Sequence, residues 1–101
     1  MATLFSLGHI VMTANLQQTL EESDSADNGT GNVMEELKGL FDRHASGDWG
    51  DLEQPDWDLN QQALETGGRL FSVYTTSKGV RLYIITEFDR SVTTALLPED
   101  Y

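Results

Sequence analysis

The sequence predicts one α+β domain: a three-stranded antiparallel meander near the C-terminus, which an N-terminal strand can extend, with two or three helices packed on one face. Residues 67–98 hold three short runs rich in β-branched and aromatic residues, separated by turn-forming residues. The segments before this stretch carry apolar residues at helical spacing. A length of 101 residues fits a single domain, 1–101, with one modest core.

The N-terminal segment favours a strand followed by a short helix. Residues 4–12 (LFSLGHIVM) are of strand length and rich in Val, Ile, Leu and Phe, with Gly8 as a bend or bulge. Thr13 or Asn15 can cap the helix, and its two leucines lie four positions apart on one face. Two apolar residues bury little surface, so we expect this helix to pack against the sheet.

The next segment, residues 21–32 (EESDSADNGTGN), contains no apolar residue larger than alanine. Such a composition cannot bury enough apolar surface to offset the entropy that is lost when a chain becomes ordered. We therefore predict a mobile acidic loop at 21–32.

The clearest helix signal follows this segment. Asn32 can cap the helix, with Glu35 at the capping-box position. Gly39 costs a helix roughly 1 kcal/mol relative to alanine, which indicates close approach of the backbone to the sheet. His44 lies in the last turn, where a cation complements the helix dipole. One apolar face is formed by Val33, Leu37, Leu40, Phe41 and His44.

Residues 44–57 form a glycine-rich loop that holds both tryptophans and four acids. A tryptophan in such a loop either buries its indole against the domain or serves as an interface hot spot surrounded by acids. The sequence leaves both alternatives open for Trp49 and Trp57.

A third helix and the meander complete the predicted fold. Asp56 or Asp58 can cap the helix, and the glycines at 67–68 can end it. Residues 75–79 fit a type I turn closed by a glycine bulge, and residues 88–91 form the second turn. Because the middle strand has apolar residues on both faces, we expect both faces of the sheet to be partly covered.

The charge is unevenly distributed along the chain. The sequence has 17 acids and 6 bases, a formal net charge of −11, and 13 of the acids but only two of the bases lie between Glu21 and Glu65. Such a field repels phosphates and anionic membranes and attracts basic surfaces. We therefore expect no direct nucleic-acid binding and no membrane association. The expected partner is a basic protein, one whose own ligand is nucleic acid.

Composition and motifs argue against several kinds of functional site. The absence of cysteine excludes disulfides and thiolate metal sites and favours a reducing cytoplasm. The first twelve residues have no basic n-region, and no run approaches the roughly 20 apolar residues of a membrane span. His9 and His44 lie far apart without a metal-binding spacing, and no phosphate-binding or nucleophile motif occurs. We expect no metal and no cofactor.

A small enzyme or ligand-binding domain is an alternative hypothesis. His44, Glu87, Asp89 and Arg90 could provide a base, carboxylates and a cation. Turn chemistry explains the residues at 86–91 equally well, since Asp and Ser satisfy backbone groups in turns. An enzyme is therefore the minor interpretation.

Several motifs together resemble a known family. They are Arg43-His44, SGDWGD at 46–51, GRLFS at 68–72 and ITEFDRS at 85–91. This combination, spread over roughly residues 34–101, resembles short plasmid- and phage-borne bacterial proteins labelled "plasmid-related protein" or "type I restriction endonuclease subunit M". The resemblance implies a mobile-element setting, in which small acidic proteins block host defence nucleases. The sequence itself has neither the glycine-rich loop nor the Asn/Asp-Pro-Pro-aromatic motif of a methyltransferase.

The leading hypothesis is an anti-defence inhibitor, anti-CRISPR or anti-restriction, that acts in the bacterial cytoplasm by occupying a basic nucleic-acid-binding surface. A further alternative is a plasmid-maintenance accessory protein that forms a homo-oligomer along an exposed sheet edge. The residues predicted to contact the partner are Asp42, Asp48, Trp49, Asp51, Glu53, Asp56, Trp57 and Asp58.

Overall fold

A four-stranded mixed sheet forms the centre of the protein. The computed structural model describes residues 3–26 and 33–101. The strands are β1 (His9–Met12), β2 (Leu70–Thr75), β3 (Arg81–Thr86) and β4 (Val92–Leu96). Their order is β1-β4-β3-β2, with β2, β3 and β4 antiparallel and β1 parallel to β4. The predicted α+β class and meander are confirmed, and an N-terminal strand does extend the sheet.

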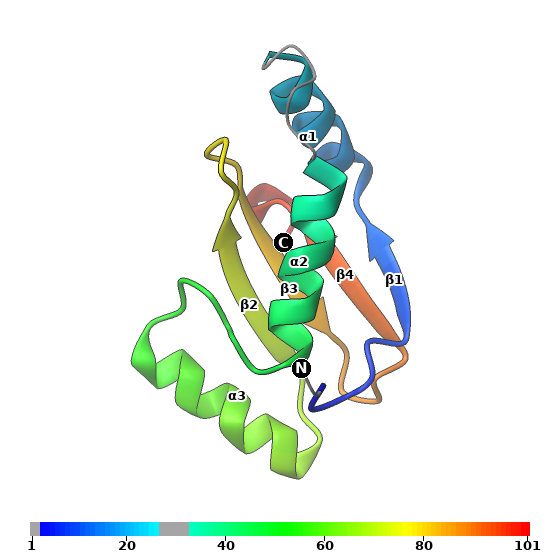
Figure 1. The fold of residues 1–101 in the computed structure, drawn as a ribbon. Helices are drawn as coiled ribbons and strands as arrows, with labels where there is room; N and C mark the ends of the chain where they lie inside the picture. The colour runs from blue at the N-terminus through cyan, green and yellow to red at the C-terminus, as the bar shows by residue number, and fades with distance from the viewer. Residues whose placement is uncertain (1–2, 27–32) are drawn as a thin grey trace.

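Three helices lie against or beside this sheet. They are α1 (Ala14–Ala26), α2 (Val33–Ala45) and α3 (Gln54–Thr66), and a short 3₁₀ helix, η1, covers Pro98–Asp100. Figure 1 shows α2 lying across one face of the sheet, α1 beyond the end of β1, and α3 to one side, near the start of β2. No helix in the described parts of the chain is long and apolar enough to span a membrane.

The main core lies between α1, α2 and the sheet. Leucines of both helices pack against the side chains of β2, β3 and β4 that point towards the helices. The buried members are Leu16, Leu20, Leu37, Leu40, Phe41, Tyr74, Leu82, Ile84, Ala95 and Leu97. The helical spacing in the sequence correctly placed the leucines of α1 and α2 on buried faces.

Helix α1 is longer than expected. It begins after Thr13, whose hydroxyl accepts a hydrogen bond from the Leu16 N–H at 3.2 Å, and it continues to Ala26. The predicted loop at 21–32 is therefore wrong for residues 21–26, and residues 27–32 lie outside the described residues. Once its first turns are anchored in the core, each further residue adds a helical hydrogen bond, so the helix can extend through this polar segment.

Helix α3 begins earlier than predicted. Its N-cap is Glu53, and Pro55 occupies the first turn, so neither Asp56 nor Asp58 caps it. Proline suits this turn because its backbone has no N–H to leave unpaired. At the other end Gly67 adopts the left-handed conformation with φ 86°, which confirms the prediction that glycine ends this helix.

The bend before β1 requires glycine. Gly8 has φ 64°, and a Cβ atom there would overlap the carbonyl oxygen of Ser91. Its neighbour His9 donates its N–H to that same oxygen at 3.0 Å. The close approach of Gly8 to the β3–β4 turn therefore starts the parallel pairing of β1 with β4.

Gly39 does not have the role predicted from the sequence. It is exposed on α2, and an added Cβ would meet nothing within 4 Å. Gly39→Ala is therefore expected to raise the free energy of unfolding by about 0.5–1 kcal/mol, because alanine restricts the unfolded chain more. Urea denaturation measures this gain. Gly79→Ala is the matched control: its site is equally open, but φ is 84°, so it should lower stability.

Candidate functional site

The loop between α2 and α3 is held against the outer edge of β2. The Val73 N–H donates to the Trp49 carbonyl at 3.1 Å, and the Asp51 N–H donates to the Val73 carbonyl at 2.7 Å. Gly50, between them, has φ 75°, and a Cβ there would overlap the Val73 carbonyl oxygen. Only glycine allows this close approach, which determines the path of the loop between α2 and α3.

Helix α3 is attached to the same edge by Asn60. Its Nδ2 donates to the Phe71 carbonyl at 2.6 Å, and its Oδ1 accepts the Phe71 N–H at 3.1 Å. The carboxamide thus pairs with β2 as the backbone of a neighbouring strand would. Asn60 is buried, and the sequence-based prediction missed it. The available signal was an amide at a helical spacing shared with Trp57, Ala63 and Leu64.

Trp49 is buried against the domain and is not an exposed interface residue. Its side chain is fully buried, stacked on Phe5 and edge-on to His44. It therefore offers no surface to a partner, and its prediction as an interface hot spot is wrong. Its indole N–H has no acceptor among the described residues. Trp57 is half-buried against the same cluster, which includes Ala63 and Leu70.

Two of the predicted acids are paired with bases. Asp48 accepts from Nε of Arg43 at 2.8 Å and from its Nη2 at 3.3 Å, which raises the pKa of Arg43 and lowers that of Asp48. Asp51 lies 4.0 Å from Nη1 of Arg81 and accepts from the Thr75 hydroxyl. These two acids present less net charge than the sequence suggested.

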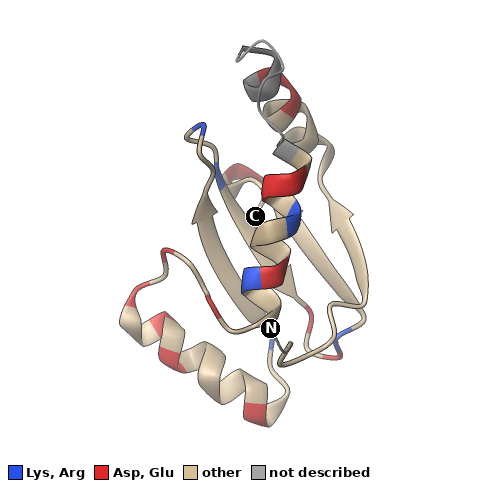
Figure 2. Cartoon of the chain, in the orientation of Figure 1, with Lys and Arg blue, Asp and Glu red and all other residues tan. Residues whose placement is uncertain are grey.

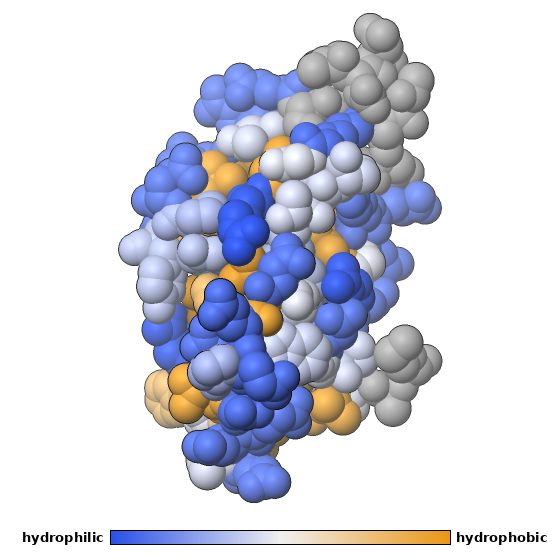
Figure 3. All heavy atoms as spheres, turned by 90° about the vertical axis from the view of Figure 1, so that its left-hand side faces the viewer, coloured by the Kyte–Doolittle hydropathy of each residue, from blue (hydrophilic) through white to orange (hydrophobic). Residues whose placement is uncertain are grey.

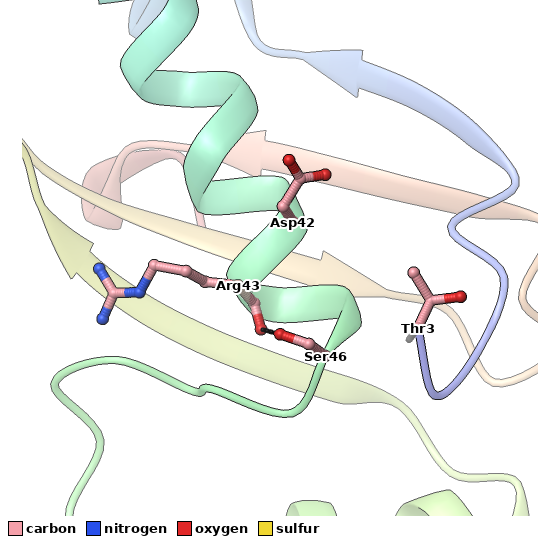
Figure 4. A pocket seen from close by; sticks show the side chains of 4 residues that line it. All are labelled: Thr3, Asp42, Arg43 and Ser46. Atoms are coloured by element: carbon pink, nitrogen blue, oxygen red, sulfur yellow. Dashed lines mark hydrogen bonds between the residues drawn. The ribbon is translucent and has the colours of Figure 1, made fainter. Parts of the chain in front are cut away.

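Asp42 lies apart from the other predicted acids. It is exposed on α2 and lines a pocket of about 340 Å³ with Thr3, Arg43 and Ser46. In Figure 4 the Asp42 side chain points to the opposite side of α2 from Arg43. Arg43 points towards the loop between α2 and α3, where it pairs with Asp48. Asp42 points the other way, so the structure does not bring it together with the acids of that loop.

Three predicted acids lie at the N-cap and in the first two turns of α3. Glu53, Asp56 and Asp58 are all exposed, and Asp58 accepts a hydrogen bond from Nε2 of Gln54 at 2.9 Å. Figure 2 shows acids along α3 and its preceding loop, and the sequence of α3 contains no Lys or Arg. We call Glu53, Asp56 and Asp58 the acidic α3 end.

The surface around the acidic α3 end is mostly polar. Figure 3 shows this side of the molecule, where the part formed by α3 is largely hydrophilic with small hydrophobic spots. One apolar side chain of α3, Leu59, is 60% exposed beside these acids. A partner that covers these acids would also bury this leucine.

His44 is the centre of a buried chain of hydrogen bonds. Thr93 donates to the Leu7 carbonyl at 2.7 Å, so Thr86 must donate to Thr93, also at 2.7 Å. Thr86 then accepts from Nε2 of His44 at 2.9 Å, and Nδ1 accepts from Ser72 at 2.5 Å. With a neutral imidazole, each hydroxyl and N–H donor of this chain of hydrogen bonds has an acceptor.

The burial of His44 overturns its predicted role at the end of α2. The side chain is fully buried, and burial, together with the charge of Arg90, lowers its pKa to about 3. A neutral imidazole cannot complement the helix dipole as a cation would. The Ser72–His44 pair resembles a nucleophile and base, but both side chains are fully buried, so no substrate can reach them.

The other residues of the enzyme hypothesis have separate structural roles. Glu87 pairs with Arg69 at 3.2 Å. Asp89 accepts from the N–H and hydroxyl of Ser91, and the hydroxyl bond lowers its pKa. Arg90 donates to the carbonyls of Gly68 and Glu87 at 2.6 and 3.1 Å. The structure therefore does not assemble these side chains with His44 into one accessible site.

Within residues 3–26 and 33–101, no three His, Asp or Glu side chains are grouped so that they could hold a metal ion. No protein-family model, no curated protein and no solved structure matches this chain. Among the predicted site residues, those of the acidic α3 end are exposed.

Proposed function

We propose that this protein is a small acidic protein-binding module from a mobile genetic element, an anti-defence inhibitor of the anti-CRISPR or anti-restriction type. It would act in the bacterial cytoplasm by occupying a basic nucleic-acid-binding surface. The observation that carries the proposal is the acidic α3 end, three exposed carboxylates on a helix without a base. The mobile-element setting is supported by the family resemblance of the sequence motifs alone.

Rigid attachment makes these carboxylates suited to recognition. Asn60 and the backbone pairing at Val73 hold α3 and its preceding loop against β2. Because the backbone that carries these carboxylates is already held in place, binding to a basic cleft costs less conformational entropy than binding by a flexible loop would. The net charge of −11 adds long-range attraction, which speeds association with a basic partner.

The proposed contact surface is smaller than the set predicted from the sequence. It comprises Glu53, Asp56 and Asp58 with the exposed Leu59, while Trp57 supports the helix from below. Asp48 and Asp51 border this surface with their charges partly compensated by Arg43 and Arg81. Asp42 and Trp49 are no longer included.

Neutralising the acidic α3 end tests the proposal. The triple variant Glu53→Gln, Asp56→Asn, Asp58→Asn is expected to bind a purified defence complex roughly tenfold more weakly, because an exposed ion pair contributes roughly 0.2–1 kcal/mol. Pull-down from a lysate of host cells identifies the complex, and titration at low and high salt measures the affinity. Binding of the unmodified protein should weaken as salt rises.

A matched control removes three acids elsewhere. Glu21, Glu22 and Glu99 are exposed outside α3, so changing all three to glutamine alters the net charge equally. This control should associate somewhat more slowly because its net charge is smaller, but it should lose clearly less affinity than the α3 variant. Equal weakening in both triple variants would show that net charge alone matters, and failure to find any partner at low salt would refute the proposal.

A further inference from the structure

The two edges of the sheet differ in how they are covered. The outer edge of β2 is occupied by residues 49–51 at Val73 and by Asn60 at Phe71. The opposite edge is β1, and in the described parts of the chain no strand or side chain pairs with its outer side. An uncovered edge presents backbone N–H and C=O groups that can pair with another strand.

The side chains of β1 are largely exposed and mostly apolar. Ile10 and Val11 point to opposite faces of the sheet and are 54% and 45% exposed. Each face of β1 therefore carries an exposed apolar side chain next to the open edge. The strand also contains no lysine or proline, the residues that commonly protect an edge from pairing.

The backbone geometry shows which groups are free to pair. His9 and Thr13 donate their N–H groups to Ser91 and Ala95 on the β4 side, both at 3.0 Å. Because backbone direction alternates along a strand, the N–H and C=O groups of Ile10 and Met12 point away from β4.

We propose that β1 pairs antiparallel with β1 of a second copy of this chain, around a two-fold axis that passes midway between the two Val11 residues. In this register Ile10 of each copy lies opposite Met12 of the other, and all their outward N–H and C=O groups are bonded. The two Val11 residues face each other across the axis as a pair without backbone hydrogen bonds. The two sheets then form one continuous sheet.

The β1 edge is uncharged, so it is where two copies of this acidic chain would repel each other least. Neither β1 nor the adjacent β4 contains an acid, a lysine or an arginine. Asp100, beyond the end of β1, already accepts hydrogen bonds from Thr13 and Asn15. Two chains of net charge −11 can approach most easily at an uncharged edge, with each acidic α3 end at the far side of its sheet.

The same arrangement limits assembly to two copies. An isologous two-fold contact uses the β1 edge of both chains and leaves only the β2 edges, which are covered. The inference is independent of the proposed function, since dimerisation is measured without a partner protein.

Light scattering after size exclusion provides the first test. Across a concentration series, the unmodified protein is expected to approach twice its 11.2 kDa chain mass. Ile10→Lys and Val11→Lys should each remain at the monomer mass with unchanged circular dichroism, because a lysine on the edge opposes pairing. Leu59→Lys is the matched control: it changes a 60% exposed side chain and the charge equally, and it should still dimerise.

Cross-linking provides a second test that does not depend on disrupting the edge. The chain has no cysteine, so Val11→Cys introduces a single thiol at the two-fold axis. Opposed Cα atoms in such a pair lie about 4.5 Å apart, within the range of a disulfide. Oxidation should give a covalent dimer from Val11→Cys but not from the control Leu59→Cys.

Three outcomes would overturn the inference. They are a monomer at every concentration, a dimer that Ile10→Lys and Val11→Lys leave intact, and equal cross-linking of Val11→Cys and Leu59→Cys. A foreign protein bound at β1 of a monomeric chain would likewise replace the second copy as its occupant.

Discussion

His44→Ala is expected to lower the free energy of unfolding by about 3–5 kcal/mol, a large share of the stability of a small domain. The change removes a fully buried ring and leaves a cavity beneath α2. It also leaves the Ser72 hydroxyl without its acceptor and the Thr86 oxygen without the donor that His44 provides. Urea denaturation at pH 7 measures the loss. A loss below about 1 kcal/mol would contradict the central role of this network.

The same histidine is expected to make the protein sensitive to acid. The pKa of its imidazole is about 3 in the folded protein, against an ordinary value of 6.5, so the unfolded chain takes up the proton first. The stabilisation is complete above pH 6.5 and falls by about 1.4 kcal/mol per pH unit as the pH drops towards 3. Denaturation curves between about pH 7 and pH 4 follow this loss.

Two variants separate His44 from the other titrating groups. His44→Gln keeps a donor and an acceptor but does not titrate, so its stability should fall by about 3 kcal/mol less than that of the unmodified protein between pH 7 and pH 4. His9→Gln changes the other, exposed histidine and should follow the unmodified protein. Parallel pH profiles for His44→Gln and the unmodified protein would refute the assignment.

Asn60→Asp is expected to destabilise the attachment of α3 by about 2–4 kcal/mol at pH 7. The amide donates one hydrogen bond to the Phe71 carbonyl and accepts one from the Phe71 N–H. An ionised carboxylate can only accept, so one of its oxygens would face the carbonyl oxygen in a buried position. Chemical denaturation at pH 7 measures the loss.

The effect of Asn60→Asp should become smaller as the pH falls. A protonated carboxyl can donate to the Phe71 carbonyl, so folding raises the pKa of the introduced group. The introduced carboxyl therefore stabilises the folded variant at low pH, and this contribution is lost as the pH rises. The pH dependence has the opposite sign to that of His44. Gln61→Glu, an exposed change on the same helix, is the control and should shift stability by less than about 0.5 kcal/mol. A pH-independent loss for Asn60→Asp would contradict this account.

Features controlled by neighbouring residues were predictable from the sequence. The meander follows from β-branched runs between turn residues, and Gly67 and Gly79 adopt the left-handed conformations that their turns require. The buried faces of α1 and α2 follow from the spacing of their leucines. In each case the determining interactions lie within a few positions along the chain.

The composition of the candidate site was predictable, but its arrangement was not. The excess of acids before residue 66 is visible in the sequence, as is the absence of bases from α3. The pairing of Asp48 with Arg43 and of Asp51 with Arg81 depends on distances that spacing does not define. The burial of Trp49 depends on Phe5, which lies more than 40 positions earlier in the chain.

The sequence by itself determined the α+β class, the antiparallel meander and the strongly acidic character of the protein, because these follow from local preference and composition. Only the tertiary structure decided that β1 pairs parallel with β4, that Asn60 covers the edge of β2, and that His44 is neutral in the core. These features arise from contacts between segments far apart in the chain. Their energies depend on burial and on the geometry of hydrogen bonds, which no local pattern encodes.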